Sequence, residues 1–439
     1  MLDPNCINSR SLGTDMHNLA RSLWSFNRSL TGDGNRQTLN LIKSHIPELA
    51  IREVPSGTEV FDWRVPQEWS VNEAYIITPQ GEKICDFNEN NLHLVGYSKN
   101  VKLDCSLEQL EGHLFSIPEQ PDAIPYITSY YEDRWGFCIK HRDRQKLKKG
   151  TYRVIVNSNH FDGHLTYGEL LIPGKTKKEI FLSTYICHPS MANNELSGPV
   201  VTAFLAKWAL RRGENKYSYR IVFVPETIGA ITYLSENISL MKKNIIAGFQ
   251  ITCVGDNRSY SFLPSRLGTT LSDHVARHTL HHIDPEFQSY SWLQRGSDER
   301  QYCSPNVNLP IASIMRTKYG EYPEYHTSLD DLDTVVSAEG LYGGFNALQK
   351  AIEIIERNCY PKTTVACEPN LGSRGLYPTL STLEATDQRV EARNFINILS
   401  LSDGEKSLLE IADILQKPFW ELYPATQTLN KHGLLDLSD

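Results

Sequence analysis

Residues 181–199 read FLSTYICHPSMANNELSGP, and this stretch decides the fold. The apolar run 181–187 ends at His188-Pro189-Ser190, and a polar segment around Asn193-Asn194-Glu195 precedes a second apolar run over 200–210. The pattern predicts a buried strand, a polar loop and a helix. In open α/β sheets the loops after the carboxyl ends of the strands carry functional side chains. We therefore expect His188 at a metal or acid–base site, with a buried structural histidine as the alternative.

Length and composition limit the class of protein. With 439 residues the chain is long enough for two or three domains, and 40% hydrophobic with 22% charged residues is typical of globular proteins. A net charge of −8 argues against a general affinity for nucleic acid or anionic membranes. The nine cysteines form no CxxC pairs, which favours a reducing compartment. The N-terminal residues do not resemble a signal peptide and no apolar run is long enough to span a membrane, so we expect a cytoplasmic protein.

Alternating strand and helix patterns follow the opening stretch. Apolar strand-like runs occupy 219–224, 245–254 and 311–315, and an amphipathic helical pattern covers 341–355. Two helices are expected between residues 13 and 49, separated by Thr31-Gly32-Asp33-Gly34. These units predict an α/β domain with a mainly parallel sheet and helices on both faces.

Two further regions differ from this pattern. Over 55–173, alternating aromatic and β-branched residues with Gly-containing turns predict an inserted β-rich domain. After a linker at 358–378 that is rich in Pro and Gly, helical patterns cover 408–415 and 419–429 and a short strand is expected over 433–437. Two helices followed by a local β-hairpin predict a winged helix. The expected domains are therefore an α/β domain from 1–54 and 174–360, the insert at 55–173, and the winged helix at 385–439.

The expected winged helix lacks the charge of a typical DNA-binding module. Residues 391–439 contain four Lys or Arg against eight Asp or Glu, and the expected recognition helix begins FWELYP without an arginine. DNA-binding modules present basic faces to the phosphates. We therefore interpret this region as a packing or dimerisation module, which allows a homo-oligomer, and keep a transcriptional regulator as an alternative.

Three more expected strand ends carry chemistry. Glu226 follows the strand at 219–224, Asp298 and Arg300 lie in the loop QRGSDERQYC, and His326 follows the strand at 311–315. Histidines and carboxylates converging from several strand ends could hold one zinc ion, with a carboxylate beside its water as general base. The alternatives are structural: Glu226 as a helix cap, Asp298 paired with Arg300, and His326 bonded to the backbone.

The order His188…Asn194…Glu226…Ser297-Asp298…Tyr325-His326 resembles the co-catalytic zinc aminopeptidases, a family that includes glutaminyl cyclase-like enzymes. More narrowly, CHPSMANNELSGP, VPETIGAITYL, GSDERQYC and EYHTSLDDL resemble a bacterial family that joins an aminopeptidase-like domain, an inserted β domain and a C-terminal winged helix. Members of that family often occur in polysaccharide or natural-product loci. The resemblance spans nearly the whole chain.

The chain departs from the aminopeptidase pattern at three metal ligands. The resemblance places the metal-bridging Asp at Asn194, the second residue of a Glu-Glu pair at Thr227, and a later ligand Asp near Thr252. Neutral side chains compensate little of a dication's charge, so a two-zinc site is not expected.

What remains implies one zinc ion. The ligands would be His188, His326 and a carboxylate from Glu226 or Glu195. Asp298 would orient these groups or be the third ligand. By the resemblance Glu226 is the general base; if it is instead a ligand, Glu195 or Asp298 is left as the base.

The implied function is a zinc-dependent peptidase or amide hydrolase in which a zinc-bound water attacks an amide carbonyl of a small peptide or acyl-amino-acid-like substrate. His164, Tyr325 and Arg300 are candidate substrate-binding residues, and the aromatic run at 125–131, with Trp135, is a candidate wall over the site. The main alternative is a catalytically degenerate, ligand-binding or scaffold protein on the same fold, favoured by the three neutral replacements.

Overall fold

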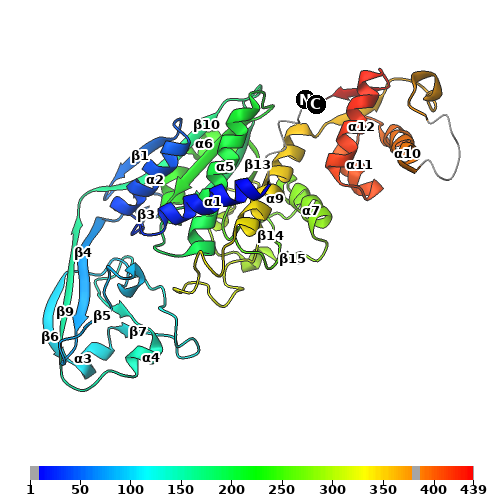
Figure 1. Ribbon diagram of the computed structural model, residues 1–439. Helices are drawn as coiled ribbons and strands as arrows, with labels where there is room; N and C mark the ends of the chain where they lie inside the picture. Colours follow the sequence, from blue (N-terminus) through cyan, green and yellow to red (C-terminus); the bar gives the residue numbers. More distant parts are fainter. Residues whose placement is uncertain (1–8, 378–385, 439) are drawn as a thin grey trace. The chain divides into compact units, whose positions relative to one another are not determined.

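The computed structural model describes residues 9–377 and 386–438. The chain divides into two compact units, 1–272 with 288–346 and 273–287 with 347–439, each described here by itself. The first unit contains a large central sheet with flanking helices and a smaller sheet (Figure 1). None of the helices in the described part of the chain combines the length and the apolar character that crossing a bilayer requires.

The central sheet is mixed, with its parallel pairs in the middle. Its strand order is β1-β10-β12-β11-β13-β16-β14-β15. The bounds are β1 Ala50–Pro55, β10 His164–Ile172, β11 Glu179–Tyr185, β12 Ser218–Val224, β13 Ile245–Gln250, β14 Ser261–Leu263, β15 Gln288–Ser289 and β16 Ile311–Met315. Strand β11 pairs in parallel with β12 and β13, and β13 pairs in parallel with β16. The antiparallel pairs are β1 with β10, β10 with β12, and β14 with β16. The predicted α/β class is confirmed.

Helices cover both faces of this sheet. Helix α5 (Ser197–Arg212) joins β11 to β12, and α6 (Ile228–Asn244) joins β12 to β13 on the other side of β11. Since both crossovers connect parallel strands and are right-handed, α5 and α6 lie on opposite faces. Every residue of β11 is buried, as expected for a strand covered twice. The connections from β11 and β12 therefore lead to opposite sides of β11, which makes its carboxyl end a topological switch point. Open α/β sheets form ligand sites at such points.

The two predicted N-terminal helices are present as α1 (Ser9–Leu23) and α2 (Asp33–His45). The remaining longer helices are α7 (Leu271–Ile283) and α9 (Ala338–Arg357), and the short α8 (Glu299–Tyr302) follows the loop with Asp298. The amphipathic pattern at 341–355 therefore lies inside α9, as predicted.

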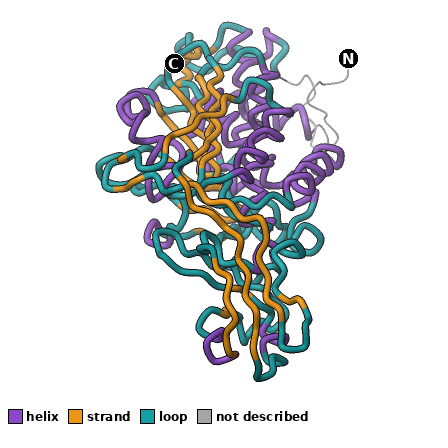
Figure 2. Tube along the Cα trace, turned by 90° about the vertical axis from the view of Figure 1, so that its left-hand side faces the viewer, coloured by secondary structure: helices purple, strands orange, loops and turns teal. Residues whose placement is uncertain are grey.

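The inserted region forms its own sheet, in the order β5-β4-β9-β6. The bounds are β4 Glu68–Ile77, β5 Lys83–Ile84, β6 Val101–Ser106 and β9 Thr151–Phe161, with the two-residue strands β2 Glu59–Val60, β3 Trp63–Arg64, β7 Leu114–Phe115 and β8 Phe137–Cys138 and the short helices α3 Leu107–Glu111 and α4 His141–Arg144 nearby. The long strands are seen in Figure 2. Strand β10 falls in the predicted insert but pairs with β1 and β12 in the central sheet, because the turn at Asp162-Gly163 passes the chain from one sheet to the other.

The second unit contains the winged helix, built from α10 (Thr386–Leu401), α11 (Leu408–Leu415), α12 (Phe419–Lys431), β17 (Tyr360–Thr363) and β18 (Leu435–Ser438). Strand β18 pairs with β17, so the expectation of a local β-hairpin after the helices is wrong. The partner comes from the segment 358–378 predicted as a linker. A four-residue strand beginning Tyr-Pro is too short to stand out as a periodic pattern.

Helix α12 uses its aromatic side chains within its own unit. The Phe419 N–H donates to His278 Nε2 at 2.9 Å. The Trp420 ring lies under the Lys350 ammonium at 4.1 Å, and the Tyr423 ring under the Arg357 guanidinium at 5.1 Å. These contacts agree with a packing role for the helix, which stays a prediction.

Candidate functional site

The loops that leave β11, β12, β13 and β16 meet at the carboxyl edge of the central sheet. His188 follows β11, Glu226 follows β12, Thr252 follows β13, and His326 lies in the long loop after β16. Four residues in these loops, or beside them, have a positive φ without being glycine: Ser190, Thr227, Cys253 and His326. Such conformations cost energy and concentrate at functional sites.

A π-helical turn, Ala192–Leu196, connects the His188 loop to α5. Its backbone N–H groups are capped by Asp330, whose carboxylate accepts from Asn193 N at 2.7 Å and Asn194 N at 2.9 Å. Gly198 permits the close approach of this turn to the sheet, because a Cβ there would lie 2.5 Å from Thr184 Oγ1 and 2.6 Å from Ile251 O. Single π turns in helices are frequent at functional sites.

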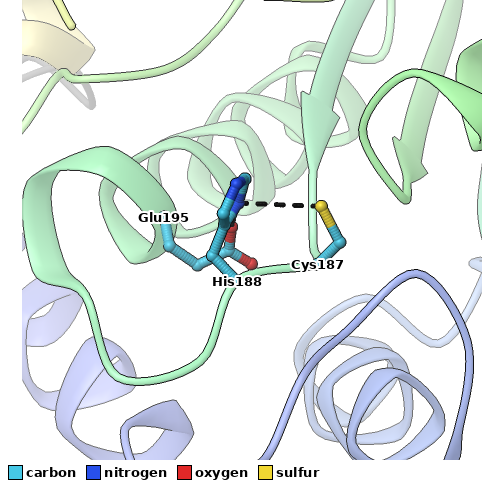
Figure 3. A group of neighbouring side chains, drawn as sticks. All are labelled: Cys187, His188 and Glu195. Carbon is cyan, nitrogen blue, oxygen red and sulfur yellow. Dashed lines mark hydrogen bonds and ion pairs between the residues drawn. The ribbon is translucent and has the colours of Figure 1, made fainter. Parts of the chain in front are cut away.

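His188 is held by a buried ion pair. Its Nδ1 lies 2.8 Å from Glu195 Oε2, and the other oxygen of Glu195 lies 3.3 Å from Arg28 Nε. Arg28 comes from the loop between α1 and α2 and also donates to the His188 carbonyl at 2.9 Å. The side chains of Arg28 and Glu195 have no exposed surface. Figure 3 shows Glu195 beside the His188 ring, with Cys187 next to it. Glu195 thus fixes the ring, leaving Nε2 for chemistry.

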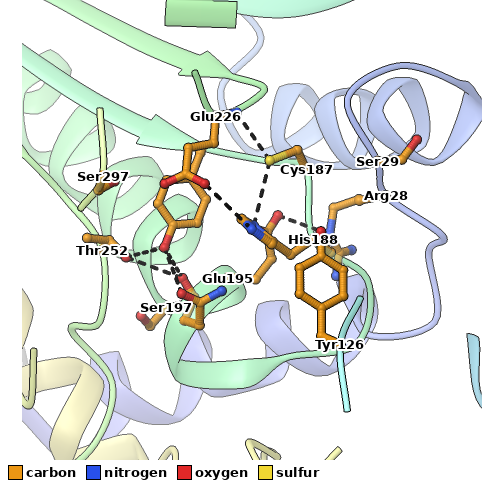
Figure 4. Close-up of polar contacts among 12 residues, drawn as sticks. Arg28, Ser29, Tyr126, Cys187, His188, Glu195, Ser197, Glu226, Thr252 and Ser297 are labelled. Carbon is orange, nitrogen blue, oxygen red and sulfur yellow. Dashed lines mark hydrogen bonds and ion pairs between the residues drawn. The ribbon is translucent and has the colours of Figure 1, made fainter. Parts of the chain in front are cut away.

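Glu226 faces the free side of that ring. Its Oε2 lies 3.7 Å from His188 Nε2, and the two groups point toward each other in Figure 4. The Glu226 N–H donates to the Cys187 thiol at 3.1 Å, which ties the loop after β12 to the end of β11. Glu226 is therefore positioned beside His188 by its backbone, and its carboxyl remains available to the pocket.

The residue after Glu226 is conformationally strained and clamped. Thr227 is β-branched with φ +65°, a region such residues rarely occupy. Its N–H donates to Asp298 Oδ1 at 2.7 Å, and its hydroxyl accepts from Arg300 at 2.6 Å. Asp298 is fully buried, and within the described chain its Oδ2 has no hydrogen-bond partner. Asp298 therefore supports the turn that presents Glu226.

Neutral groups occupy the positions at which the aminopeptidase resemblance would expect metal ligands. The Tyr185 hydroxyl lies 3.0 Å from Asn194 Oδ1, 2.7 Å from Asn194 O and 2.5 Å from Thr252 Oγ1. All three residues are buried. Asn194 and Thr252, two of the predicted departures from the metal pattern, thus bond to the same tyrosine hydroxyl. Burial raises the pKa of this hydroxyl well above its usual value.

A strap from the insert lies across the site. Tyr126 N donates to His326 O at 2.8 Å, and Ser328 N donates to Ile124 O at 2.9 Å. The Tyr126 ring centroid is 5.2 Å from both the His188 and the His326 rings, which are 5.7 Å from each other. Tyr325 stacks on His326 at 3.9 Å. His326 is therefore held between aromatic rings at the edge of the site.

Burial and mutual charge shift the ionisable groups. Burial alone would lower the pKa of His188, but the hydrogen bond and charge of Glu195 outweigh it and raise that pKa. Burial raises the pKa of Glu226, against the opposing charges of His188 and Arg300. Burial and the charge of Glu226 raise the pKa of Asp298 well above its usual range. Burial, with the charge of His188, lowers the pKa of His326 to about 3, so its imidazole is neutral. Burial therefore favours the protonated forms of the Glu226 and Asp298 carboxyl groups.

A cavity of about 390 Å³ opens at this site. Of the predicted residues it is lined by His188, Glu226 and Arg300, together with Thr227, Leu30, Trp63, Tyr130, Tyr131, Cys187, Ile228 and Gln301. Glu195, Asp298, His326 and Tyr325 stand behind or beside these groups rather than in the lining. His164 does not line the cavity; it starts β10, and its N–H donates to Glu68. Trp135 stacks on His113 at 3.7 Å, away from the lining.

The residues do not fit a pair of zinc ions. Asn194 and Thr252 are neutral and hydrogen-bonded to the Tyr185 hydroxyl. Thr227 is hydrogen-bonded to the guanidinium of Arg300. Two dications need carboxylates to compensate their charge, and none of these three residues supplies one.

A second grouping also fails as a metal site. Among the described residues, Cys187, His188 and Glu195 form the one group of three ligating side chains whose ligand atoms all lie within 4.8 Å. Burial raises the pKa of the Cys187 thiol well above its usual value, and Arg28 places a positive charge beside Glu195. A protonated thiol is a poor metal ligand, and the guanidinium beside Glu195 repels a cation.

Two donors that face each other remain in the cavity. His188 Nε2 and the Glu226 carboxylate share the cavity 3.7 Å apart without a hydrogen bond between them. The His326 ring, whose centroid lies 5.7 Å from that of His188, is a second imidazole beside them. It is neutral because burial lowers its pKa. A histidine whose other nitrogen is bonded to a carboxylate is the usual form of a zinc-binding imidazole.

Several site residues gave no signal in the sequence. Arg28 lies 160 residues from His188 in the chain, and only the packing of α1 against α5 brings its loop to the site. Tyr185 ends an apolar strand and could be taken for core. Trp63 sits in a two-residue strand of the insert. No local pattern distinguishes these residues, because each acts through a contact distant in sequence.

Comparisons with known proteins place this geometry in a family. A family model described as "Domain of unknown function (DUF4910)" matches residues 17–358. The chain belongs to this family. A winged helix-turn-helix model matches residues 358–437. The predicted combination of an aminopeptidase-like domain and a C-terminal winged helix is thereby confirmed.

Relatives agree with this assignment. A protein from Clostridium acetobutylicum named "Putative polysaccharide biosynthesis protein with aminopeptidase-like domain" is 41% identical over 431 residues, covering 98% of each chain. A crystal structure of a "putative peptidase" from the same species has a TM-score of 0.91 at 40% identity, covering 98% of this chain and 97% of that one. The zinc aminopeptidase of Bacillus subtilis has a TM-score of 0.59 at 12% identity, covering 79% and 94%, which shows the shared fold alone.

Proposed function

We propose that this family member is an amide hydrolase of the aminopeptidase-like fold that works with one zinc ion. The observation that carries the proposal is the pairing of His188 Nε2 and Glu226 in the cavity, with Glu195 holding the opposite side of the imidazole. An oriented imidazole and a carboxyl of raised pKa, facing one cavity, are the parts that hydrolysis of an amide needs.

His188 and His326 would hold the ion, with Glu226 beside it. When bound, zinc supplies polarisation of a carbonyl oxygen and a water of lowered pKa. Glu226 is the one carboxylate in the cavity lining, so it takes the proton of the attacking water and returns it to the leaving nitrogen. Burial raises its pKa, which favours the protonated form that donates to the leaving nitrogen.

Three other residues position these groups. Glu195 and Arg28 orient His188, and Asp298 keeps the strained turn at Thr227 that presents Glu226. Glu195 and Asp298 are therefore assigned positioning roles, whereas the general-base role goes to Glu226. The name of the Clostridium relative supports placing the substrate in polysaccharide biosynthesis, and the cytoplasmic location and homo-oligomer stay predictions.

A second candidate is a ligand-binding protein without turnover. The observation that favours it is the neutral network of Tyr185, Asn194 and Thr252, which holds this part of the site together without metal. Such a protein would keep the cavity and bind no zinc.

Metal content per chain, measured by inductively coupled plasma mass spectrometry on untagged protein purified without chelator, separates the two. The hydrolase predicts about one zinc per chain, lost in His188→Ala and retained in the control His432→Ala, whose histidine is exposed near the C-terminus. Protein that stays metal-free after zinc addition overturns the zinc hydrolase in favour of the ligand-binding candidate.

A further inference from the structure

The cavity lining includes an arginine that forms no close ion pair with the described residues, although its charge acts on Glu226 and Asp298. Arg300 lines the cavity, and its side chain donates to the Thr227 hydroxyl at 2.6 Å. Across residues 9–377 and 386–438 no ion pair involves Arg300. A guanidinium has five N–H donors in a planar fork that matches a carboxylate. The neighbouring Arg295 differs, since it lies over the Trp292 ring and does not line the cavity.

Two exposed aromatic rings border the same cavity. Trp63 is 41% exposed and Tyr131 is 57% exposed, and their rings meet edge to face at 5.9 Å. Tyr131 also has φ +64°, a strained conformation for a tyrosine. Large apolar rings left in water beside a cavity mark a surface that a ligand covers.

The charges in the lining select against a free amine. An ammonium group needs an ionised carboxylate, and Glu226 is the one carboxylate in the lining; it is assigned to proton transfer and faces His188. Arg300, by contrast, has no such assignment. The cavity is therefore complementary to a substrate that carries a negative charge.

We propose, resting on the amide hydrolase above, that the substrate is an N-acyl amino acid rather than a peptide with a free amine. Arg300 binds the α-carboxylate, Trp63 and Tyr131 cover a ring-bearing acyl group, and the amide lies at His188 and Glu226. Hydrolysis forms a bond from the water oxygen to the carbonyl carbon and breaks the C–N bond. Glu226 carries the proton from the water to the leaving nitrogen, which gives a carboxylic acid and an amino acid.

Three small probes test the charge preference by isothermal titration calorimetry on the full-length chain. Hippurate has a ring, an amide and a carboxylate; N-benzoylglycinamide lacks only the charge; phenylalaninamide has a free amine. Titrations are made on chelator-treated and on zinc-supplemented protein, so that binding of a carboxylate to metal is separated from binding to Arg300. We expect hippurate to bind at least about tenfold more tightly than N-benzoylglycinamide in both states, and phenylalaninamide to bind most weakly.

Substitutions assign the preference to residues. Arg300→Gln should reduce the affinity for hippurate to that for N-benzoylglycinamide, while Arg295→Gln keeps the difference. Trp63→Ala should weaken both benzoyl probes by a similar factor, and Trp63→Phe should restore most of it.

Equal affinities for hippurate and its amide, no measurable binding of hippurate, tighter binding of phenylalaninamide, or a preference that survives Arg300→Gln would each overturn the proposal. If Trp63→Ala binds the benzoyl probes as tightly as the unaltered chain does, the assignment of Trp63 to the acyl group is overturned. If the carboxylate preference holds but the protein contains no zinc and releases no glycine from hippurate, the hydrolase fails and the binding inference stands.

Discussion

The two halves of the site differ in charge, although both lie at the same edge of one sheet. In the half around His188, an imidazole, two carboxylates and a guanidinium form a chain from Arg28 through Glu195 to Glu226. In the half around Tyr185, three neutral residues bond to one another. The first half keeps groups that can move a proton, whereas the second has replaced them by a hydrogen-bonded network.

The difference shows how neutral groups can stabilise a buried position that holds no metal. A buried carboxylate that no metal compensates is costly, so an amide and a hydroxyl are the more stable occupants of a metal-free position. The Tyr185 hydroxyl then hydrogen-bonds to the oxygens of Asn194 and Thr252. The charged half avoids the same cost by pairing, since Arg28 offsets Glu195.

The largest effect is expected in the charged half. Glu226→Gln removes the proton acceptor and should lower kcat/KM for hippurate by about 10²–10⁴-fold in zinc-loaded protein. The rate of glycine release measures kcat/KM. The control is Glu48→Gln, a substitution of an exposed residue. Unchanged turnover would show that Glu226 is not the proton acceptor and would remove the chemical distinction between the halves.

The ion pair behind His188 should control stability. Arg28→Ala leaves Glu195 buried without its cation and should lower the free energy of unfolding by about 3–5 kcal/mol in urea titrations. The control Arg52→Ala breaks an exposed contact to Glu169 and should cost less than about 1 kcal/mol. A loss in Arg28→Ala as small as in the control would mean that the charged half does not depend on this pair.

Asp330, which accepts from the Asn194 N–H, should make the stability of the neutral half depend on pH. Burial raises its pKa to about 6 in the folded chain, against the lowering effect of the Asn193 and Asn194 N–H groups, while the unfolded value is near 3.8. The folded state therefore holds the proton more tightly, and stability falls as pH rises from about 4 to about 6. The loss amounts to about 3 kcal/mol.

Asp330→Asn should flatten this part of the profile, measured as the difference in unfolding free energy between variant and unaltered chain at several pH values. The exposed control Asp62→Asn should leave the profile in place. A difference that does not change with pH would contradict the assignment to Asp330.

The smallest effect is expected at the tyrosine hydroxyl. Tyr185→Phe removes its hydrogen bonds to Asn194 and Thr252 and should cost about 1–3 kcal/mol, because buried oxygens lose their partner. Thermal unfolding measures it, with the exposed Tyr377→Phe as control. An unchanged midpoint would show that the neutral network does not stabilise this half.

Much of the fold could be predicted from local patterns. The strands at 219–224 and 311–315, the two N-terminal helices and α9 were all visible as runs of apolar residues at strand or helix spacing. The partner of the predicted strand at 433–437 was missed, because β18 pairs with β17, a short strand before α10. Pairing between distant short strands leaves no periodic pattern in either one.

The site divides in the same way. By itself the sequence determined which residue types end the strands of the central sheet. It predicted that His188 and Glu226 would lie at one edge, because the carboxyl ends of parallel strands share one edge of a sheet. Only the tertiary structure decided that Glu195 binds His188, that Arg28 closes the pair, and that Tyr185 fills the neutral half. Those contacts depend on how α1, the strap at 124–128 and the strand-end loops pack together. A side chain's partner is set by distances between segments, which no local pattern records.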